Sequence, residues 1–226
     1  VSYLRLMLVL FDIDGTMLSS EGIGVRSMEK AGEVLFGKRF SLKDIPIGGR
    51  LDPLIWNDIC LKYGIAEPNR WQDAFRTTYV SILEQDIQDV NVTILPGIEA
   101  LLQRIRDNSS VQLGIVTGNW KESGMCKLNA AGIDLSEFSH YAWGSDGQER
   151  ADLPPVAIGK FSGPVVLIGD TVHDITSGHS SGCKVIAVCT GSHSRDTLKV
   201  ANPDLLVEDL SKTEEVYQWI IQYQSQ

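Results

Sequence analysis

The sequence predicts an α/β fold, in which helices cover both faces of a parallel sheet and a helical segment is inserted near the start of the chain. Three observations support this prediction. Short, continuously apolar runs recur along the chain, as expected of strands buried on both faces. Helix-like segments separate these runs, and alternating strands and helices favour a parallel sheet. Residues 17–93 carry no comparable apolar run and instead show helical periodicity.

The expected strands are residues 6–11, 113–116, 165–168 and 185–188, with 205–207 as a weaker fifth. The expected helices between them are 97–106, 123–131, 154–161 and 175–181. Proline near the start of a segment and glycine just after its end support these limits. Inside the insert, apolar residues spaced by three and four predict helices over 23–36, 51–63 and 71–86.

Composition excludes several classes of protein. The chain has 226 residues, 43% of them hydrophobic and 22% charged, which is enough to bury a core and argues against disorder. A net charge of −9 argues against general binding to nucleic acid. No apolar run approaches the ~20 residues of a membrane span. The four cysteines form no CxxC pair, which suits a reducing compartment, so we expect a cytoplasmic protein.

Two pairs of carboxylates follow expected strands. Asp12 and Asp14 come directly after the first strand, and Asp170 and Asp174 follow the strand at 165–168. Because the carboxyl ends of parallel strands share one edge of the sheet, all four are expected to lie close together there. They would repel one another and raise some of their pKa values unless a divalent cation held them, and hard oxygen ligands suit Mg²⁺.

A third expected strand ends in Thr117-Gly118-Asn119. A hydroxyl followed by an accessible backbone N–H can hold a phosphate oxygen, although a strand that ends in an ordinary Thr-Gly turn is an equally good interpretation. Residues 26–50 of the insert carry six basic and three acidic side chains. We therefore expect an anionic substrate to approach from the insert.

Together, the three strand ends resemble the haloacid dehalogenase (HAD) superfamily of aspartate-nucleophile hydrolases. The segment Asp12-Ile13-Asp14-Gly15-Thr16 is similar to its first motif, Thr117 to its second, and Gly169-Asp170 with Asp174 to its fourth. The resemblance spans nearly the whole chain. The insert also fits the helical cap that many members, including phosphoglycolate phosphatase and β-phosphoglucomutase relatives, carry between the first and second motifs. It implies a HAD-like (Rossmann-like) core of residues 1–16 and 94–226 and an all-α cap of residues 17–93.

The resemblance also implies site residues. Asp12 would be the nucleophile and Asp14 the general acid and base. Mg²⁺ would be held by Asp12, the main-chain carbonyl of Asp14 and Asp170, with Asp174 acting directly or through water. Thr117, Gly118 and Asn119 would hold the phosphate.

The third motif departs from the family, because relatives usually carry a lysine there. Arg150 stands just ahead of the helix expected at 154–161, where that lysine belongs, whereas Lys160 lies near its end. We expect Arg150 to take the role and Lys160 to be an ordinary surface residue, although an arginine fork differs in geometry from an ammonium group. Arg50 follows two glycines in a turn of the insert and is expected to reach the mouth of the site, although most arginines in such turns are simply solvated.

The implied function is a Mg²⁺-dependent phosphatase, a hydrolase that cleaves a small phosphomonoester of the phosphoglycolate or sugar phosphate type through an aspartyl-phosphate. Asp14 argues against a dehalogenase, because the resemblance implies that dehalogenases lack this second acid, since a halide leaves without a proton. A phosphomutase and a catalytically inactive phosphate-binding module remain as alternatives. The expected partner is a small phosphorylated metabolite, with no nucleic acid and no membrane, and the chain is expected to be a monomer or a homodimer.

Overall fold

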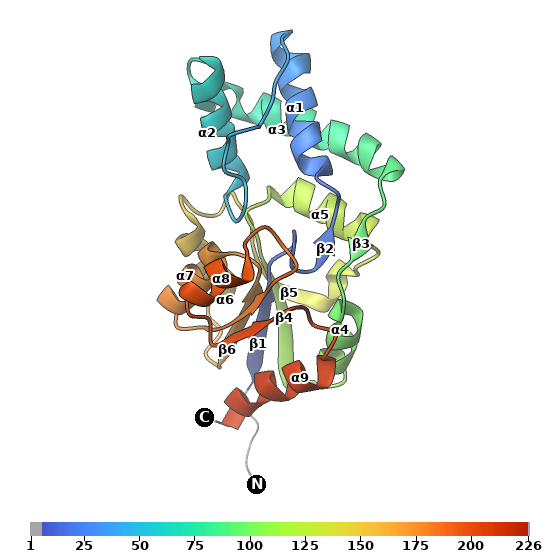
Figure 1. Cartoon of the computed structure of the whole chain (residues 1–226), viewed down its shortest axis with the longest axis vertical. Helices are drawn as coiled ribbons and strands as arrows, with labels where there is room; N and C mark the ends of the chain where they lie inside the picture. Colours follow the sequence, from blue (N-terminus) through green and yellow to red (C-terminus); the bar gives the residue numbers. More distant parts are fainter. Residues whose placement is uncertain (1–5, 226) are drawn as a thin grey trace.

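The computed structural model describes residues 6–225 and contains a six-stranded parallel sheet in the order β5-β4-β1-β6-β7-β8 (Figure 1). In sheet order the strands are β5 (Phe138–Ala142), β4 (Val111–Val116), β1 (Met7–Phe11), β6 (Val165–Gly169), β7 (Lys184–Val188) and β8 (Leu205–Val207). Because β1 pairs with both β4 and β6, the segments that follow these three strands leave the same edge of the sheet side by side.

Helices cover both faces of the sheet, as the fold class requires. The odd-numbered residues of β1 pack in one cluster with α4 (Ile98–Arg106), α5 (Lys121–Ala130) and α9 (Thr213–Ile221). Its even-numbered residues pack with α6 (Leu153–Ile158) on the opposite face. The helices α7 (Val172–Ser180) and α8 (Arg195–Val200) pack against β7. This alternation follows from the two-residue period of a strand, and it explains why all five residues of β1 are buried.

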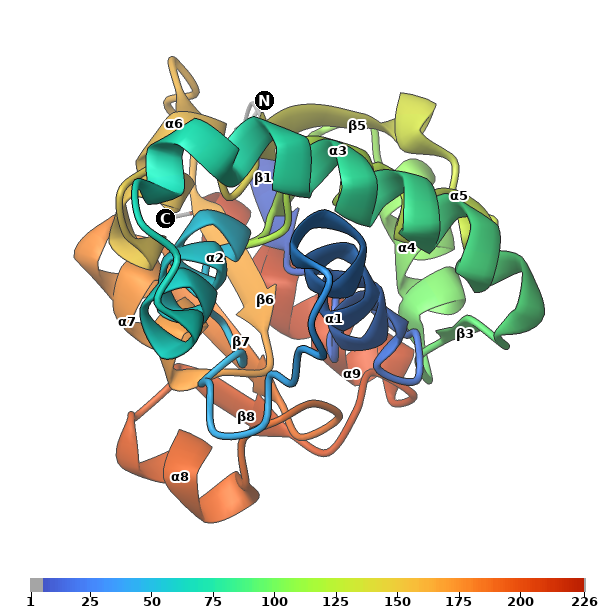
Figure 2. The same cartoon turned by 90° about the horizontal axis from the view of Figure 1, so that it is seen from above.

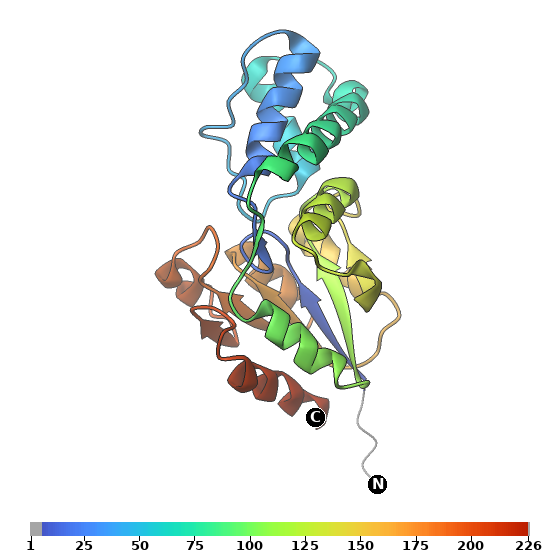
Figure 3. The same cartoon turned by 90° about the vertical axis from the view of Figure 1, so that its right-hand side faces the viewer.

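Three helices form the insert above the sheet: α1 (Ile23–Phe36), α2 (Asp52–Tyr63) and α3 (Pro68–Asp86). Figure 3 shows them above the carboxyl edge of the sheet, and in Figure 2, which is seen from above, they lie in front of it. They have their own cluster of buried side chains. Trp56 and Phe75 stack in it with ring centroids 4.2 Å apart. The chain enters and leaves the insert through two short antiparallel strands, β2 (Leu18–Ser19) and β3 (Thr93–Ile94).

The predicted α/β class and parallel sheet are confirmed, and all five expected strands are present. The edge strand β5 was missed because its sequence, FSHYA, mixes polar and apolar residues. Helices α8 and α9 were also missed. Helix α7 begins at Val172 rather than at residue 175, because Thr171 caps it and accepts a hydrogen bond from the backbone N–H of Asp174.

Short 3₁₀ helices complete the described chain: η1 (Ile87–Asp89), η2 (Leu135–Glu137), η3 (Arg150–Asp152) and η4 (Gln222–Ser225). Within residues 6–225, no helix is both long enough and apolar enough to cross a bilayer.

Candidate active site

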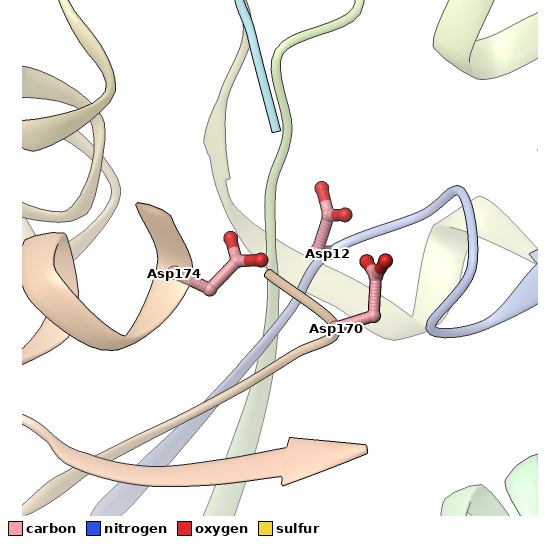
Figure 4. A group of neighbouring side chains, drawn as sticks. All are labelled: Asp12, Asp170 and Asp174. Carbon is pink, nitrogen blue, oxygen red and sulfur yellow. The ribbon is translucent and has the colours of Figure 1, made fainter. Parts of the chain in front are cut away.

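Three buried aspartates converge at the carboxyl edge of the sheet (Figure 4). Asp12 follows β1, Asp170 follows β6, and Asp174 lies in the first turn of α7. One carboxylate oxygen from each lies within 4.8 Å of the others. The sequence predicted this proximity, because β1 and β6 are parallel neighbours.

Arg150, in η3, holds two of these carboxylates. Its Nη2 donates hydrogen bonds to Asp12 Oδ1 at 2.9 Å, to Asp174 Oδ1 at 2.5 Å and to the main-chain oxygen of Val116 at 3.2 Å. One nitrogen therefore makes all three contacts, and within the described chain the buried Nε has no hydrogen-bond partner. Lys160, the other candidate cation, is exposed beyond the end of α6.

Asp174 is the most fully engaged of the three aspartates. Its second oxygen, Oδ2, accepts hydrogen bonds from the backbone N–H of Thr171 at 3.0 Å and from the Thr171 hydroxyl at 2.7 Å. Both oxygens of Asp174 are thus used by the protein, one to start α7 and one to orient Arg150. Asp170 accepts hydrogen bonds from the Thr16 hydroxyl at 3.3 Å and from the backbone N–H of Ser192 at 2.9 Å.

The acidic cluster fits a divalent cation. Burial raises the pKa of Asp170 to about 8, and repulsion from Asp12 and Asp174 adds to this effect. Burial also raises the pKa of Asp12 to about 6, although Arg150 opposes the shift. A cation among these oxygens would favour their charged forms, and an all-oxygen donor set is the type that Mg²⁺ prefers.

The side chain of Asp14 is not part of this cluster. Its two oxygens accept hydrogen bonds from Lys127 Nζ at 2.9 and 2.8 Å, and Oδ2 also accepts one from the Asn119 amide at 2.8 Å. The Asn119 amide nitrogen also donates to the Thr117 hydroxyl oxygen at 2.7 Å, which links two predicted phosphate-binding residues to Asp14.

Lys127, on α5, is a site residue that the sequence did not reveal. Burial alone would lower its pKa, but the carboxylates of Asp14 and Asp52 outweigh that effect and raise it. Its Nζ also donates to Asn119 Oδ1 at 2.7 Å. No pattern in the sequence distinguishes this lysine from a surface lysine, because its partner Asp14 is 113 positions away.

The insert docks on the loop at residues 117–119. The carbonyl of Gly118 accepts a hydrogen bond from the backbone N–H of Asp52 at 2.7 Å, and a Cβ at Gly118 would lie 2.0 Å from the main-chain oxygen of Arg50. The Asp52 carboxylate accepts hydrogen bonds from the backbone N–H of Trp120 at 2.8 Å and from the Ser123 hydroxyl at 3.2 Å. These contacts place Arg50 at the cavity.

A cavity of about 430 Å³ lies between the edge of the sheet and the insert. Asp174 is fully buried behind it and does not line it. The other predicted site residues all line the cavity: Asp12, Asp14, Arg50, Thr117, Gly118, Asn119, Arg150 and Asp170. Residues that lie far apart in the sequence therefore line the same cavity in the structure.

Residues 9–188 match the model of the haloacid dehalogenase-like hydrolase family. The chain belongs to this family. The match spans β1 to β7 and includes the acidic cluster, Arg150 and the whole insert.

The chain is similar to the probable phosphatase IndB of Dickeya dadantii, with 26% identity over 215 residues that cover 91% of this chain and 90% of the relative. It is 23% identical over 226 residues to the phosphoglycolate phosphatase of Photorhabdus laumondii, covering 90% and 88%. A crystal structure from Thermotoga maritima, provisionally named a beta-phosphoglucomutase, shares the fold with a TM-score of 0.64 at 14% identity, covering 95% of this chain and all of that chain.

Proposed function

We propose that this chain is a Mg²⁺-dependent phosphatase that hydrolyses a small phosphomonoester, of the phosphoglycolate or sugar phosphate type, through an aspartyl-phosphate. The chain is a phosphatase of the haloacid dehalogenase-like family. The family match shows this, together with relatives that are named as phosphatases and that the chain matches over nearly their whole length. The observation that supports the finer proposal best is the contact of Arg150 with Asp12 beside Asp170 at the floor of the cavity.

In this proposal Asp12 attacks the phosphorus of the ester. The Asp12–phosphorus bond forms, the bond from phosphorus to the leaving oxygen breaks, and that oxygen takes a proton from the carboxyl of Asp14. Water then attacks the phosphorus and gives a proton back to Asp14, and the acyl phosphate bond breaks to release phosphate and regenerate Asp12. Arg150, the Thr117 hydroxyl and the Gly118 N–H would stabilise the phosphoryl oxygens.

Mg²⁺ would be held by the carboxylates of Asp12 and Asp170 and by the main-chain carbonyl of Asp14. When bound, it would offset the negative charge of the phosphoryl group and of the carboxylates around it. The hydrogen bonds of Asp174 with Arg150 and Thr171 favour an indirect role for Asp174, in which it reaches the ion through water or only orients Arg150.

We also propose that the chain consists of a core of residues 1–16 and 94–226 and a cap of residues 17–93, of which residues 1–5 and 226 lie outside the described part of the structure. The separate hydrophobic cluster of α1–α3 supports this division. We place the protein in the cytoplasm on the basis of its four scattered cysteines.

The test is phosphate release from p-nitrophenyl phosphate and from a panel of phosphorylated metabolites, with Mg²⁺ and with a chelator. We expect release that needs the metal and is abolished in Asp12→Asn. Asp196→Asn, an exposed substitution of the same type on α8, serves as the matched control and should behave like wild type. Full activity in Asp12→Asn would contradict the nucleophile assignment.

Two further readouts separate the alternatives. Isomerisation of a sugar phosphate faster than its hydrolysis would indicate a phosphomutase, which uses the same two aspartates. Phosphate binding without turnover of any ester would indicate an inactive binding module.

A further inference from the structure

Among the described residues that line the cavity, every lysine and arginine already contacts a carboxylate. The three are Arg50, Lys127 and Arg150. Arg150 is the one that faces the phosphoryl position, beside Asp12 and Asp170. Arg50 and Lys127 are therefore the cations available to whatever the leaving group carries.

Each of these cations is paired with a carboxylate. Lys127 Nζ has three N–H bonds, and it donates to the two oxygens of Asp14 and to Asn119 Oδ1 at 2.7 to 2.9 Å. The Nη2 of Arg50 donates to Asp58 Oδ2 on α2 at 2.7 Å, while its buried Nε has no hydrogen-bond partner within residues 6–225. A paired guanidinium or ammonium group can still orient a neutral hydroxyl, but its charge is offset by the carboxylate beside it.

The basic excess of residues 26–50 adds no further cation to the cavity wall, so its role in drawing in an anionic substrate stays a prediction. Lys30 forms an ion pair with Asp86, and Lys38 Nζ donates to the carbonyl of Tyr63 at 3.0 Å. Of the basic residues in this stretch, only Arg50 lines the cavity. The remainder lie on the outside of the insert.

The rest of the wall on the insert side is acidic, hydroxylic or apolar. Glu21 and Asp52 contribute carboxylates, Ser19 and Ser20 contribute hydroxyls, and Val25 and Met28 contribute apolar surface. A second anionic group on the substrate would meet these carboxylates, and the charges of Arg50 and Lys127 that could offset its desolvation are already balanced by Asp58 and Asp14. A neutral alcohol would meet hydroxyls that can exchange hydrogen bonds with it.

We propose that the site selects phosphomonoesters whose leaving group is an uncharged alcohol and discriminates against substrates with a second anionic group, such as phosphoglycolate or pyrophosphate. This inference rests on the proposed phosphatase function and narrows its substrate class to the sugar phosphate type. The phosphoryl group is held at the sheet edge, and the discrimination arises at the cap, where Arg50 is neutralised by Asp58.

The experiment compares two esters of equal length, 2-hydroxyethyl phosphate and phosphoglycolate, which differ by a hydroxymethyl group in place of a carboxylate. We expect kcat/KM to be at least tenfold higher for 2-hydroxyethyl phosphate with Mg²⁺ present. In Asp58→Asn the Arg50 charge is no longer offset, so this ratio should fall at least threefold, mostly through a lower KM for phosphoglycolate. Asp73→Asn, an exposed change of the same type on α3, should leave the ratio unchanged.

Equal or better turnover of phosphoglycolate by the wild type would overturn the inference, as would an unchanged ratio in Asp58→Asn when that variant unfolds at the wild-type temperature. These outcomes leave the phosphatase proposal intact as long as p-nitrophenyl phosphate is hydrolysed. Failure to release phosphate from any ester, p-nitrophenyl phosphate included, would overturn the proposed function itself.

Discussion

We propose that Arg150 takes the role of the lysine that relatives of this family usually carry, and its hydrogen bonds indicate how it would replace one. All three contacts come from Nη2, which donates to Asp12, Asp174 and Val116, so the guanidinium acts as a single donor centre rather than as a fork. Nη2 carries two N–H bonds for these three acceptors, whereas an ammonium group carries three N–H donors from one nitrogen. We therefore predict that Arg150→Lys keeps the function of the site.

The energetic balance of Arg150→Lys follows from the same contacts. Lysine can keep both charged hydrogen bonds, worth ~1.5–3 kcal/mol each, and, being one atom shorter, gives up the longest contact, to the Val116 carbonyl, worth ~1 kcal/mol. It also removes the buried Nε that has no partner in residues 6–225, a group whose desolvation costs ~1–3 kcal/mol. The two changes nearly cancel, so the free energy of unfolding should change by no more than about 1–2 kcal/mol.

Arg150→Met gives the contrasting result. It leaves the buried carboxylates of Asp12 and Asp174 without a counter-ion, which costs ~3–5 kcal/mol of stability. It also removes a donor to the phosphoryl oxygens, an effect typically worth a ~10²–10³-fold loss in kcat. For Arg150→Lys, kcat should fall by no more than about tenfold relative to wild type, which corresponds to ~1.4 kcal/mol in the activation free energy.

The assays are kcat for p-nitrophenyl phosphate with Mg²⁺ and urea unfolding of each variant. Arg195→Lys is the matched control, because Arg195 is exposed and forms an ion pair with Glu208 outside the cavity. If Arg150→Lys is as inactive as Arg150→Met while unfolding like wild type, the planar guanidinium is required and the single-donor argument is wrong.

Three further predictions concern the contacts that the structure adds to the sequence-based site. Lys127→Met should lower kcat for alkyl phosphates at least tenfold more than for p-nitrophenyl phosphate, whose leaving group needs no proton, because Lys127 positions Asp14. Asp52→Asn should flatten the pH dependence of stability measured by urea unfolding between about pH 4 and 6. Burial raises the pKa of Asp52 to about 6, so the folded wild type binds a proton at this carboxyl more tightly than the unfolded chain does. The free energy of unfolding of the wild type should therefore fall by up to about 3 kcal/mol as pH rises through that window. Gly118→Ala should destabilise the protein by ~1–3 kcal/mol in the same assay, because its Cβ would overlap the main-chain oxygen of Arg50.

Each of these predictions has a clear contrary outcome. Equal losses on both substrates in Lys127→Met would assign Lys127 a structural role rather than one in positioning Asp14. A stability difference between wild type and Asp52→Asn that is constant with pH would mean that Asp52 is not a buried acid with a raised pKa. Unchanged stability in Gly118→Ala would mean that the Arg50 segment moves away without cost.

The parts of the fold that the sequence predicted share a physical cause. Strand β1 is buried on both faces, so all of its residues are apolar and the run is visible without structural information. Strand β5 lies at the edge of the sheet and carries His140, whose ring contacts Ala157 and Gln112 rather than a closed apolar core. Because β5 contains polar residues, a search for continuous hydrophobic runs does not detect it.

The same distinction applies to the site. Asp12 and Asp170 could be predicted to lie together because each directly follows a strand and the two strands are neighbours. Lys127 and Asp52 could not be predicted, because each finds its partner only when the insert, α5 and the end of β1 have come together. Local spacing carries information about a strand end but not about a contact between elements distant in the sequence.

The contact between the insert and residues 117–119 is a second physical constraint that favours glycine at position 118. The sequence suggested that its missing side chain opens the backbone N–H to a phosphate, yet a Cβ there would also lie 2.0 Å from the main-chain oxygen of Arg50. The carbonyl of Gly118 in turn accepts the backbone N–H of Asp52, two residues after Arg50. The loop proposed to hold the phosphate and the segment proposed to select the leaving group are therefore fixed to each other by their backbones. Displacing one shifts the other, so substitutions at this contact should change kcat and substrate preference together.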